Sequence, residues 1–345
     1  MKDFLAALLA EGAAAAAVGR VGTPEGVIWT AAVGESRPGV PATPETRFDL
    51  ASLTKPFTAA LALVLAAEGT LPLATRLREV WPAAHPRLGR KTLEDLLRHR
   101  SGLQAWAPLY HLCRSRAEVL ALLLGGERLG ARAETYSDLG YLLWGLAAEE
   151  VTGRPLAALL RSRVLDPLGL AGVAMSPGDG ADLAVSSMDT GKEVGLAARQ
   201  GLTVALQPPP APGRPQDGNA RYLIGLPGFG PVLGHAGLFG TAHDLHVLAA
   251  EWLAPGRLLS PLQVTAAWTG GRSFALGWWR RTLRGSAGPA LPRSSVGHTG
   301  FAGNSVWVDR ERRRVSILLA TRIDPRCDMN RWRRRFHRDV ARQMA

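Results

Sequence analysis

The sequence predicts an α/β (α+β) protein in which one antiparallel sheet is built from both ends of the chain and the middle is mostly helical. Three observations lead to this fold class. Runs of strand-like residues lie near both termini. Between residues 76 and 170, apolar residues recur with helical spacing. Helices inserted between two sets of hairpin strands are typical of a layered sheet that both termini complete.

The first 51 residues predict a helix followed by a hairpin. A short helix over residues 3–11 precedes strands over 13–18 and 26–33, which the turn Thr-Pro-Glu-Gly separates. Asp3 and Glu11 in the first apolar stretch argue against a secretory signal peptide. The strand-like run Phe-Asp-Leu then ends at Ser52, where a strongly apolar helix begins; it continues to about Glu68, and Gly69 ends it.

The middle of the chain predicts a lobe that is mostly helical. Four segments with helical periodicity lie between residues 91 and 165, and Ser-Gly, Gly-Gly and Gly breakers separate them. Residues 207–218 (QPPPAPGRPQDG) are too rich in proline for a helix or a central strand, which favours an extended loop. We therefore expect a helical lobe over residues 52–230 and an α/β sandwich lobe from residues 1–51 and 231–345.

The last third of the chain predicts strands between two helices. Thr241 is placed to cap a helix, and Asp244 lies three residues later, as in a capping box. Strand patterns follow over residues 274–281 and 305–321, the second with a polar turn at its middle. An amphipathic helix is expected from about Asn330.

Composition excludes several classes of protein. The net charge of +12 comes mainly from arginine, with its densest runs at residues 310–314 and 331–338. These runs are typical of a hairpin turn and the solvated face of a helix, and no nucleic-acid-binding motif accompanies them. No uncharged apolar run approaches the ~20 residues of a membrane span. We expect a cytoplasmic protein without nucleic-acid partners, and the sequence carries no signal for an oligomeric state.

Two cysteines, Cys113 and Cys327, are too few for a disulfide framework. No group of His, Cys, Asp or Glu has the spacing of metal ligands. We therefore expect neither a metal nor a cofactor.

The first motif with chemical meaning is Ser52-Leu53-Thr54-Lys55. Residues i and i+3 share one face of a helix, so the hydroxyl and the amine are neighbours. A serine hydroxyl becomes a nucleophile when a base takes its proton, and burial keeps a lysine amine partly neutral for that task. The alternative is a serine that caps the helix and a lysine exposed to solvent.

Two further motifs contain polar side chains suited to proton transfer and substrate binding. Tyr136 and Asp138 precede a helix and can share protons with the serine and lysine, although Asp138 could instead cap that helix. His298 and Thr299 lie on a glycine-flanked strand whose amides can stabilise an oxyanion. The alternative is a glycine-rich strand entry that contains an incidental histidine.

Together the motifs resemble the penicillin-recognising serine enzymes, namely class C β-lactamases, D-alanyl-D-alanine carboxypeptidases and related carboxylesterases. The resemblance spans residues 18–322. It is carried by FDLASLTKPFTAALALVLAAEG, LEDLLRHRSGL, TYSDLGYLLWG, GHAGLFGTAHDL and GHTGFAGNSVWVDRERRRVSILLATR. It implies the two-lobed β-lactamase-like fold, with the active site at the lobe boundary and catalysis through an acyl-enzyme.

The resemblance also implies a role for each catalytic position. Ser52 matches the nucleophile and Lys55 its activating base. Tyr136 matches the tyrosine that passes protons to the leaving group and helps to activate the deacylating water. Asp138 occupies the position at which most relatives have asparagine. The backbone N–H groups of Ser52 and Phe301 would form the oxyanion hole.

The substrate-binding positions depart from the pattern of the family. His298 stands where β-lactamases and peptidases usually have lysine, while Thr299 and Gly300 complete that strand. Because histidine is mostly neutral near pH 7, this change weakens the case for a substrate with a carboxylate, as does the negative charge of Asp138. Phe301 is bulkier than the usual serine and is expected to narrow the acyl pocket.

Two other groups of residues have alternative interpretations. Trp106 and Tyr110 line the substrate pocket or are simply packed in the core. His235 shapes a turn before the next helix or takes part in the active site.

The leading functional expectation is an esterase that hydrolyses small esters through an acyl-enzyme on Ser52. The first alternative is an amide hydrolase, either a D-amino-acid peptidase or carboxypeptidase or a weak β-lactamase. A further alternative is a non-hydrolysing ligand-binding domain that has kept the β-lactamase-like fold. In each case the expected partner is a small molecule, an ester or an amide.

Overall fold

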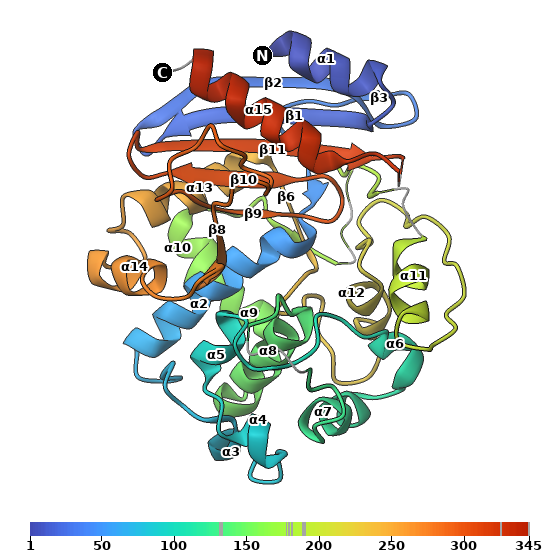
Figure 1. The fold of residues 1–345 in the computed structure, drawn as a ribbon, viewed down its shortest axis with the longest axis vertical. Coiled ribbons are helices and arrows are strands. Elements are labelled where there is room, and N and C mark those ends of the chain that lie inside the picture. Colours follow the sequence, from blue (N-terminus) through green and yellow to red (C-terminus); the bar gives the residue numbers. More distant parts are fainter. Residues whose placement is uncertain are drawn as a thin grey trace.

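Both ends of the chain contribute strands to one eight-stranded sheet (Figure 1). The strand order is β3-β2-β1-β11-β10-β9-β8-β7, and every neighbouring pair is antiparallel. This computed structural model describes residues 1–130, 134–176, 178, 180, 182–187, 191–324 and 326–343. The expected α/β class with an antiparallel sheet flanked by helices is confirmed.

The strands of the large sheet are β1 (Ala14–Thr23), β2 (Gly26–Arg37), β3 (Val40–Pro41), β7 (Phe274–Ala275), β8 (Trp278–Arg280), β9 (Val296–Thr299), β10 (Ser305–Asp309) and β11 (Arg314–Arg322). A second, three-stranded sheet has the order β4-β6-β5. Its strands are β4 (Phe48–Asp49), β5 (Ala174–Met175) and β6 (Leu238–Gly240). The small sheet matters for function because β4 leads directly to Ser52.

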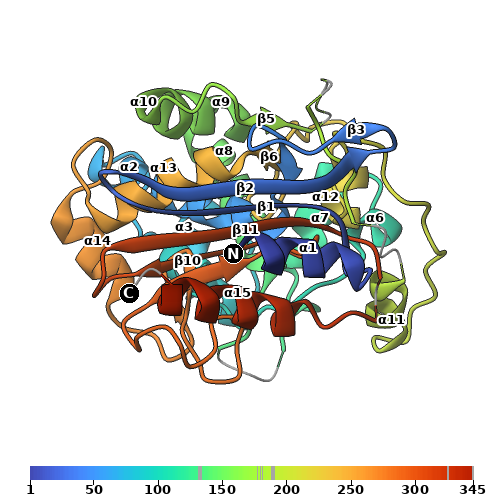
Figure 2. The ribbon, with the colours of Figure 1, turned by 90° about the horizontal axis from the view of Figure 1, so that it is seen from above.

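Two terminal helices cover the outer face of the large sheet (Figure 2). They are α1 (Lys2–Ala10) and α15 (Met329–Gln343). Their apolar faces form one buried cluster with β1 and β11, in which Phe4 contacts both Trp332 and Phe336. Because burial of such large side chains stabilises a fold by roughly 1.5–3 kcal/mol each, this cluster fixes the two termini against the sheet.

Helices α2 (Thr54–Ala67) and α13 (Ala242–Leu253) lie on the other side of the sheet. Helix α13 packs against β1, β10 and β11, and the predicted capping box of Thr241 and Asp244 is present at its start. Helix α2 approaches the turn between β7 and β8 closely at Gly277, which has a φ of +82°. A side chain at this position would overlap Ala59 of α2, so glycine is required there.

The rest of the middle segment is helical with long connections. Its helices are α3 (Leu77–Val80), α4 (Pro86–Gly89), α5 (Leu93–Leu97), α6 (Leu109–Leu112), α7 (Arg116–Leu124), α8 (Asp138–Thr152), α9 (Leu156–Leu160), η2 (Arg161–Leu165), α10 (Asp166–Leu168), α11 (Lys192–Ala198) and α12 (Gly218–Leu223); α14 (Pro261–Trp268) follows α13. No helix in the described part of the chain is long and apolar enough to span a membrane. The division into lobes at residues 1–51 plus 231–345 and 52–230 remains a proposal.

Two local predictions need correction. The helix expected to begin at Ser52 starts with a 3₁₀ turn, η1 (Ala51–Leu53), and becomes α-helical at Thr54. The arginine run at residues 331–338 is not wholly solvated, because Arg333 lies on the buried face of α15 and is 7% exposed. Arg333 lies on the same face of the helix as the buried residues Met329, Trp332 and Phe336, because it is separated from Met329 and Phe336 by helical spacings.

Candidate active site

A buried aspartate shapes the turn that carries Ser52. The Asp49 carboxylate accepts hydrogen bonds from the amides of Ala51, at 2.9 Å, and Gln216, at 2.7 Å. Ala51 has a φ of +47°, a left-handed conformation that is strained for a residue with a side chain. Burial raises the pKa of Asp49 to about 6. The left-handed residue and the hydrogen bonds together turn the chain so that Ser52 lies in η1, the 3₁₀ turn that leads into α2.

Lys55 lies beneath Ser52 and is completely buried. Its Nζ donates hydrogen bonds to Ser52 Oγ at 2.8 Å, to Asp138 Oδ1 at 2.6 Å and to the carbonyl oxygen of His235 at 3.4 Å. Burial lowers the pKa of the Lys55 ammonium, while the Asp138 carboxylate raises it. The alternative of a solvent-exposed lysine is therefore wrong. Because burial has the larger effect, the pKa of Lys55 is lowered overall, which favours the neutral form of the amine.

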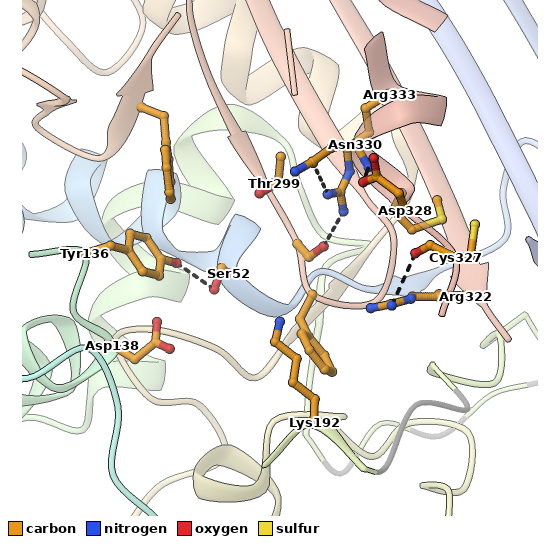
Figure 3. A pocket seen from close by; sticks show the side chains of 14 residues that line it. Ser52, Tyr136, Asp138, Lys192, Thr299, Arg322, Cys327, Asp328, Asn330 and Arg333 are labelled. Atoms are coloured by element: carbon orange, nitrogen blue, oxygen red, sulfur yellow. Dashed lines mark hydrogen bonds between the residues drawn. The ribbon is translucent and has the colours of Figure 1, made fainter. Parts of the chain in front are cut away.

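Tyr136 points its hydroxyl at Ser52 (Figure 3). Its hydroxyl donates a hydrogen bond to Ser52 Oγ at 2.9 Å. The Tyr136 ring packs against Trp279, with 5.0 Å between the two ring centroids. The Lys55 Nζ atom lies 4.9 Å from the centroid of the Tyr136 ring. Burial, followed by the charge of Asp138, raises the pKa of Tyr136 well above its usual range. The side chain is therefore a phenol at neutral pH and can donate a proton.

Asp138 is the first residue of α8, but it does not cap that helix. The cap is Ser137, whose Oγ accepts a hydrogen bond from the Gly140 amide at 3.1 Å. Ser137 Oγ also donates to the carbonyl oxygen of Gln104 at 2.6 Å, which ties the segment to a neighbouring loop. Because Ser137 provides the cap, the Asp138 carboxylate is available to form the ion pair with Lys55.

His298 lies behind the reactive groups rather than in the cleft. It is 1% exposed, and its ring centroid is 5.9 Å from that of Tyr136. Nδ1 lies 2.9 Å from the carbonyl oxygen of Thr299, whereas the buried Nε2 has no hydrogen-bond partner among the described residues. Burial and the nearby Lys55 hold the pKa of His298 well below its usual value. Its imidazole is therefore neutral and shielded from any bound substrate.

The residues after His298 do line the cleft beside Ser52. Thr299, Gly300 and Phe301 border a cavity of about 360 Å³ that extends to the start of α15 (Figure 3). Arg333 of α15 donates hydrogen bonds to the carbonyl oxygens of Gly300, at 2.7 Å, and Gly303, at 3.2 Å. Arg333 therefore supports the turn of residues 300–303, in which Phe301 lines this cavity.

A second cavity, of about 200 Å³, also borders Ser52 and shares Tyr136 and Asp138 with the first as lining residues. Trp106 lines it, as do the carboxylates of Glu193 and Asp217. Burial raises the pKa of Glu193 to about 7, and its two oxygens accept hydrogen bonds from the Tyr110 hydroxyl and the Gly218 amide. Trp106 thus lines a cavity that Ser52 also lines, and it packs in a small apolar cluster with Ala197 and Val204.

His235 takes part in the site through its backbone and through Asp217. Its carbonyl oxygen accepts from Lys55, and its Nε2 lies 3.0 Å from Asp217 Oδ1. Burial alone would raise the pKa of Asp217, yet His235 and the Ala220 amide lower it overall. This pair anchors the loop of residues 216–217 to the segment that runs along α2.

The structure thus brings Ser52, Lys55, Tyr136 and Asp138 into one hydrogen-bonded cluster. Sequence reasoning missed Asp49, Arg333, Glu193 and Asp217, because no motif spacing marks them and they reach the site from distant segments. Among the described residues, no group of three or more His, Cys, Asp or Glu side chains could hold a metal ion. The cluster contains a hydroxyl, a buried amine and a phenol, which are the groups that acyl transfer by a serine enzyme needs.

The known proteins to which the chain is similar include an amidase and an esterase. A family model described as Beta-lactamase matches residues 1–339. The chain is 27% identical over 294 residues to an N-acetylmuramyl-L-alanine amidase of Bacillus subtilis (strain 168), covering 76% of this chain and 65% of the amidase. It is 29% identical over 322 residues to the esterase EstB of Burkholderia gladioli, covering 82% of this chain and 79% of the esterase. The chain thus spans about two thirds of the amidase's length.

A solved structure shows the same fold. The class C β-lactamase of Rhodobacter sphaeroides superposes with a TM-score of 0.74 and 16% sequence identity, covering 100% of this chain and 99% of that one. At this identity the similarity establishes the fold alone.

Proposed function

We propose that the chain, which belongs to the β-lactamase family of serine hydrolases, hydrolyses small esters through a covalent acyl-enzyme on Ser52. The observation that carries the proposal is the hydrogen-bonded set in which Ser52 Oγ lies 2.8 Å from Lys55 Nζ and 2.9 Å from the Tyr136 hydroxyl. A nucleophile placed between a buried amine and a phenol can lose one proton and receive another without a change in position.

Acylation begins when neutral Lys55 accepts the proton of Ser52 Oγ. The oxygen attacks the carbonyl carbon of the ester, and the carbonyl oxygen becomes an oxyanion held by the amides of Ser52 and Phe301. The bond to the leaving alkoxide then breaks, and the Tyr136 phenol gives that oxygen its proton. The proton held by Lys55 restores the tyrosine, so the acyl-enzyme forms with no net gain or loss of protons.

Deacylation uses the same groups in reverse order. A water molecule gives a proton to the Tyr136–Lys55 pair and attacks the acyl carbonyl, and the bond to Ser52 Oγ breaks as that oxygen recovers its proton. Because Asp138 lies 2.6 Å from Lys55 Nζ, its charge stabilises the ammonium that forms transiently in both steps.

Three features favour an ester without a carboxylate over a penicillin or a peptide. His298 is neutral and buried, so it supplies no charge where relatives have lysine. Arg333 lines the larger cavity, but its Nε, NH1 and NH2 already donate to Gly303, Asn330 and Gly300. An alkoxide leaving group also demands less of the proton donor than an amine does. The similarity to the esterase EstB is consistent with this choice.

A second candidate function, amide hydrolysis, has one observation in its favour. The larger cavity is lined by Lys192 and Arg322 as well as Arg333, so cationic groups surround the reactive serine. The donors of Arg333 are already used. The charges of Lys192 and Arg322 could hold the terminal carboxylate of a D-amino-acid peptide. The relative that is an amidase points the same way.

A panel of substrates separates the two functions. We would measure kcat/KM for p-nitrophenyl butyrate, ethyl butyrate, nitrocefin and a D-alanyl-D-alanine peptide. The esterase proposal predicts the highest values for the two butyrate esters. A D-alanyl peptide or nitrocefin turned over faster than ethyl butyrate would replace it with the amidase function. Turnover of none of them would favour a ligand-binding domain.

A further inference from the structure

His99 has an unusual backbone conformation two residues after α5. Its φ is +58°, which is left-handed and uncommon for residues other than glycine, although histidine adopts it more often than most side chains do. The residue is 4% exposed, so neither solvent nor a mobile loop accounts for the conformation. Strain of this kind is unfavourable and persists where surrounding contacts enforce it. The contacts of His99 show what the strain maintains.

Two hydrogen bonds connect His99 to the residues on either side of Tyr136. The amide of Thr135 donates to the carbonyl oxygen of His99 at 2.9 Å. The amide of Ser137 donates to the Nδ1 atom of the His99 ring, also at 2.9 Å. One residue, in the left-handed conformation, therefore holds the backbone before the tyrosine through its carbonyl oxygen and after the tyrosine through its ring.

The His99 ring also forms part of the wall against which Tyr136 packs. The two ring centroids are 4.7 Å apart, and Phe274 and Tyr141 contact the other sides of the imidazole at 4.7 and 5.2 Å. Burial, with Lys55 and His298 nearby, keeps the pKa of His99 well below its usual value. The ring is therefore neutral, which leaves Nδ1 able to accept the Ser137 amide.

We propose that His99 is a positioning residue that aims the Tyr136 hydroxyl at the leaving-group oxygen. The inference rests on the proposed function, in which Tyr136 protonates the leaving group. His99 has no hydrogen bond to Ser52, Lys55 or Asp138 among the described contacts, so it acts on the reaction through Tyr136. A displacement of about 1 Å in a reacting group can cost about 100-fold in rate.

Three substitutions separate what His99 contributes. His99→Asn keeps an acceptor near Nδ1 and tolerates the left-handed backbone. His99→Gly keeps only the backbone freedom, and His99→Ala keeps neither. We expect activity to fall in the order wild type, Asn, Gly, Ala.

The decisive readout is the dependence on the leaving group. p-Nitrophenolate leaves as a stable anion, whereas the ethoxide of ethyl butyrate needs a proton as it departs. Since general acid catalysis contributes about 10²–10⁴-fold, we expect His99→Gly to lower kcat/KM by about 10–100-fold for ethyl butyrate and by less than about 5-fold for p-nitrophenyl butyrate. A role that is only structural would lower both values equally.

A double-mutant cycle with Tyr136→Phe tests the connection directly. If His99 acts through the tyrosine, His99→Gly has little further effect on ethyl butyrate once the hydroxyl is gone. Additive losses would overturn the inference while leaving the proposed function intact. If Tyr136→Phe itself leaves the ratio of the two esters unchanged, the role of the tyrosine fails, and the role of His99 fails with it.

His337 provides the matched control. It is a completely buried histidine of α15 whose ring nitrogens lie 3.3 Å from Ser305 Oγ and 2.8 Å from Ser316 Oγ, on the outer face of the sheet. His337→Asn is expected to lower the melting temperature without altering the ratio of the two esters. His99→Asn is expected to keep a ratio within about threefold of wild type. A ratio for His99→Asn as poor as that for His99→Gly would contradict the assignment of Nδ1.

Discussion

Replacement of Asp138 by asparagine removes one negative charge from the base without changing the shape of the side chain. The carboxylate lies 2.6 Å from Lys55 Nζ, and Lys55 is completely buried. At an effective dielectric constant of about 20, unit charges at this distance attract by about 6 kcal/mol, equivalent to about 5 pKa units. The asparagine oxygen still accepts a hydrogen bond from Lys55, so the loss of the charge should lower the pKa of Lys55 by less than this. We expect about 1–3 units, which is the usual effect of one neighbouring charge.

The direction of the change follows from which form of Lys55 is active. Ser52 is activated by the neutral amine, so kcat/KM rises as the pH increases through the pKa of Lys55. Asp138 stabilises the ammonium and raises that pKa. Asp138→Asn should therefore move the acid limb of the pH–kcat/KM profile for p-nitrophenyl butyrate toward lower pH by about 1–3 units.

Asp328→Asn provides the control for net charge. Asp328 lines the larger cavity but makes no ion pair with Lys55, and its side chain is 62% exposed. Screening by solvent and salt should limit its effect on the acid limb to less than about 0.3 units. An unmoved acid limb in Asp138→Asn would refute the reasoning, as would an equal shift in both variants.

Three further predictions concern residues that support the site. Gly277→Ala should lower the free energy of unfolding, measured by urea denaturation, by about 2–5 kcal/mol, because the new side chain overlaps α2 and the φ of +82° is strained for alanine. In Gly256→Ala, the control, the new methyl group meets nothing within 4 Å, and stability should change by less than about 0.5 kcal/mol. Asn304→Ala should lower the free energy of unfolding by about 2–4 kcal/mol in the same assay. The reason is that the Asn304 side chain donates to the carbonyl oxygen of Asp49 at 2.7 Å and accepts from the Ala320 amide at 2.8 Å. A loss below about 1 kcal/mol would contradict this prediction. Burial lowers the pKa of His337 to about 3, so its contribution to stability is present above pH 6.5 and is lost as the pH falls toward 3. In this pH range, the free energy of unfolding of His337→Gln should fall with decreasing pH less steeply than that of wild type, by up to about 1.4 kcal/mol per pH unit. An equal slope in the two proteins would exclude this role.

The hydroxyl–amine pair of Ser52 and Lys55 was predictable from sequence because its geometry is local. The expected α-helix proved to be a 3₁₀ turn at Ser52, yet residues i and i+3 are adjacent in that geometry too. The capping box at Thr241 and the turn of residues 310–313 between β10 and β11 are equally local, and both are present. Patterns that depend on a few consecutive residues survive errors in the exact element boundaries.

The parts that escaped prediction depend on contacts between distant segments. Charge alone suggested that residues 331–338 are solvated, but α15 turns Arg333 inward to the Gly300 carbonyl. Similarly, no spacing relates His99 to Tyr136 or Asp49 to Gln216, because these pairs form only when the sheet and helices are assembled. Sequence also could not tell that His298 is buried behind the tyrosine rather than exposed to substrate.

The acyl-enzyme on Ser52 is the central claim, and one experiment tests it most directly. Wild type and Ser52→Ala would be assayed with p-nitrophenyl butyrate, and the intact mass of each would be recorded after exposure to a fluorophosphonate probe. The account predicts that wild type turns over the ester and gains a single adduct, whereas Ser52→Ala does neither. Equal turnover or labelling by the alanine variant would contradict the account, as would a wild-type protein that is inert and unlabelled.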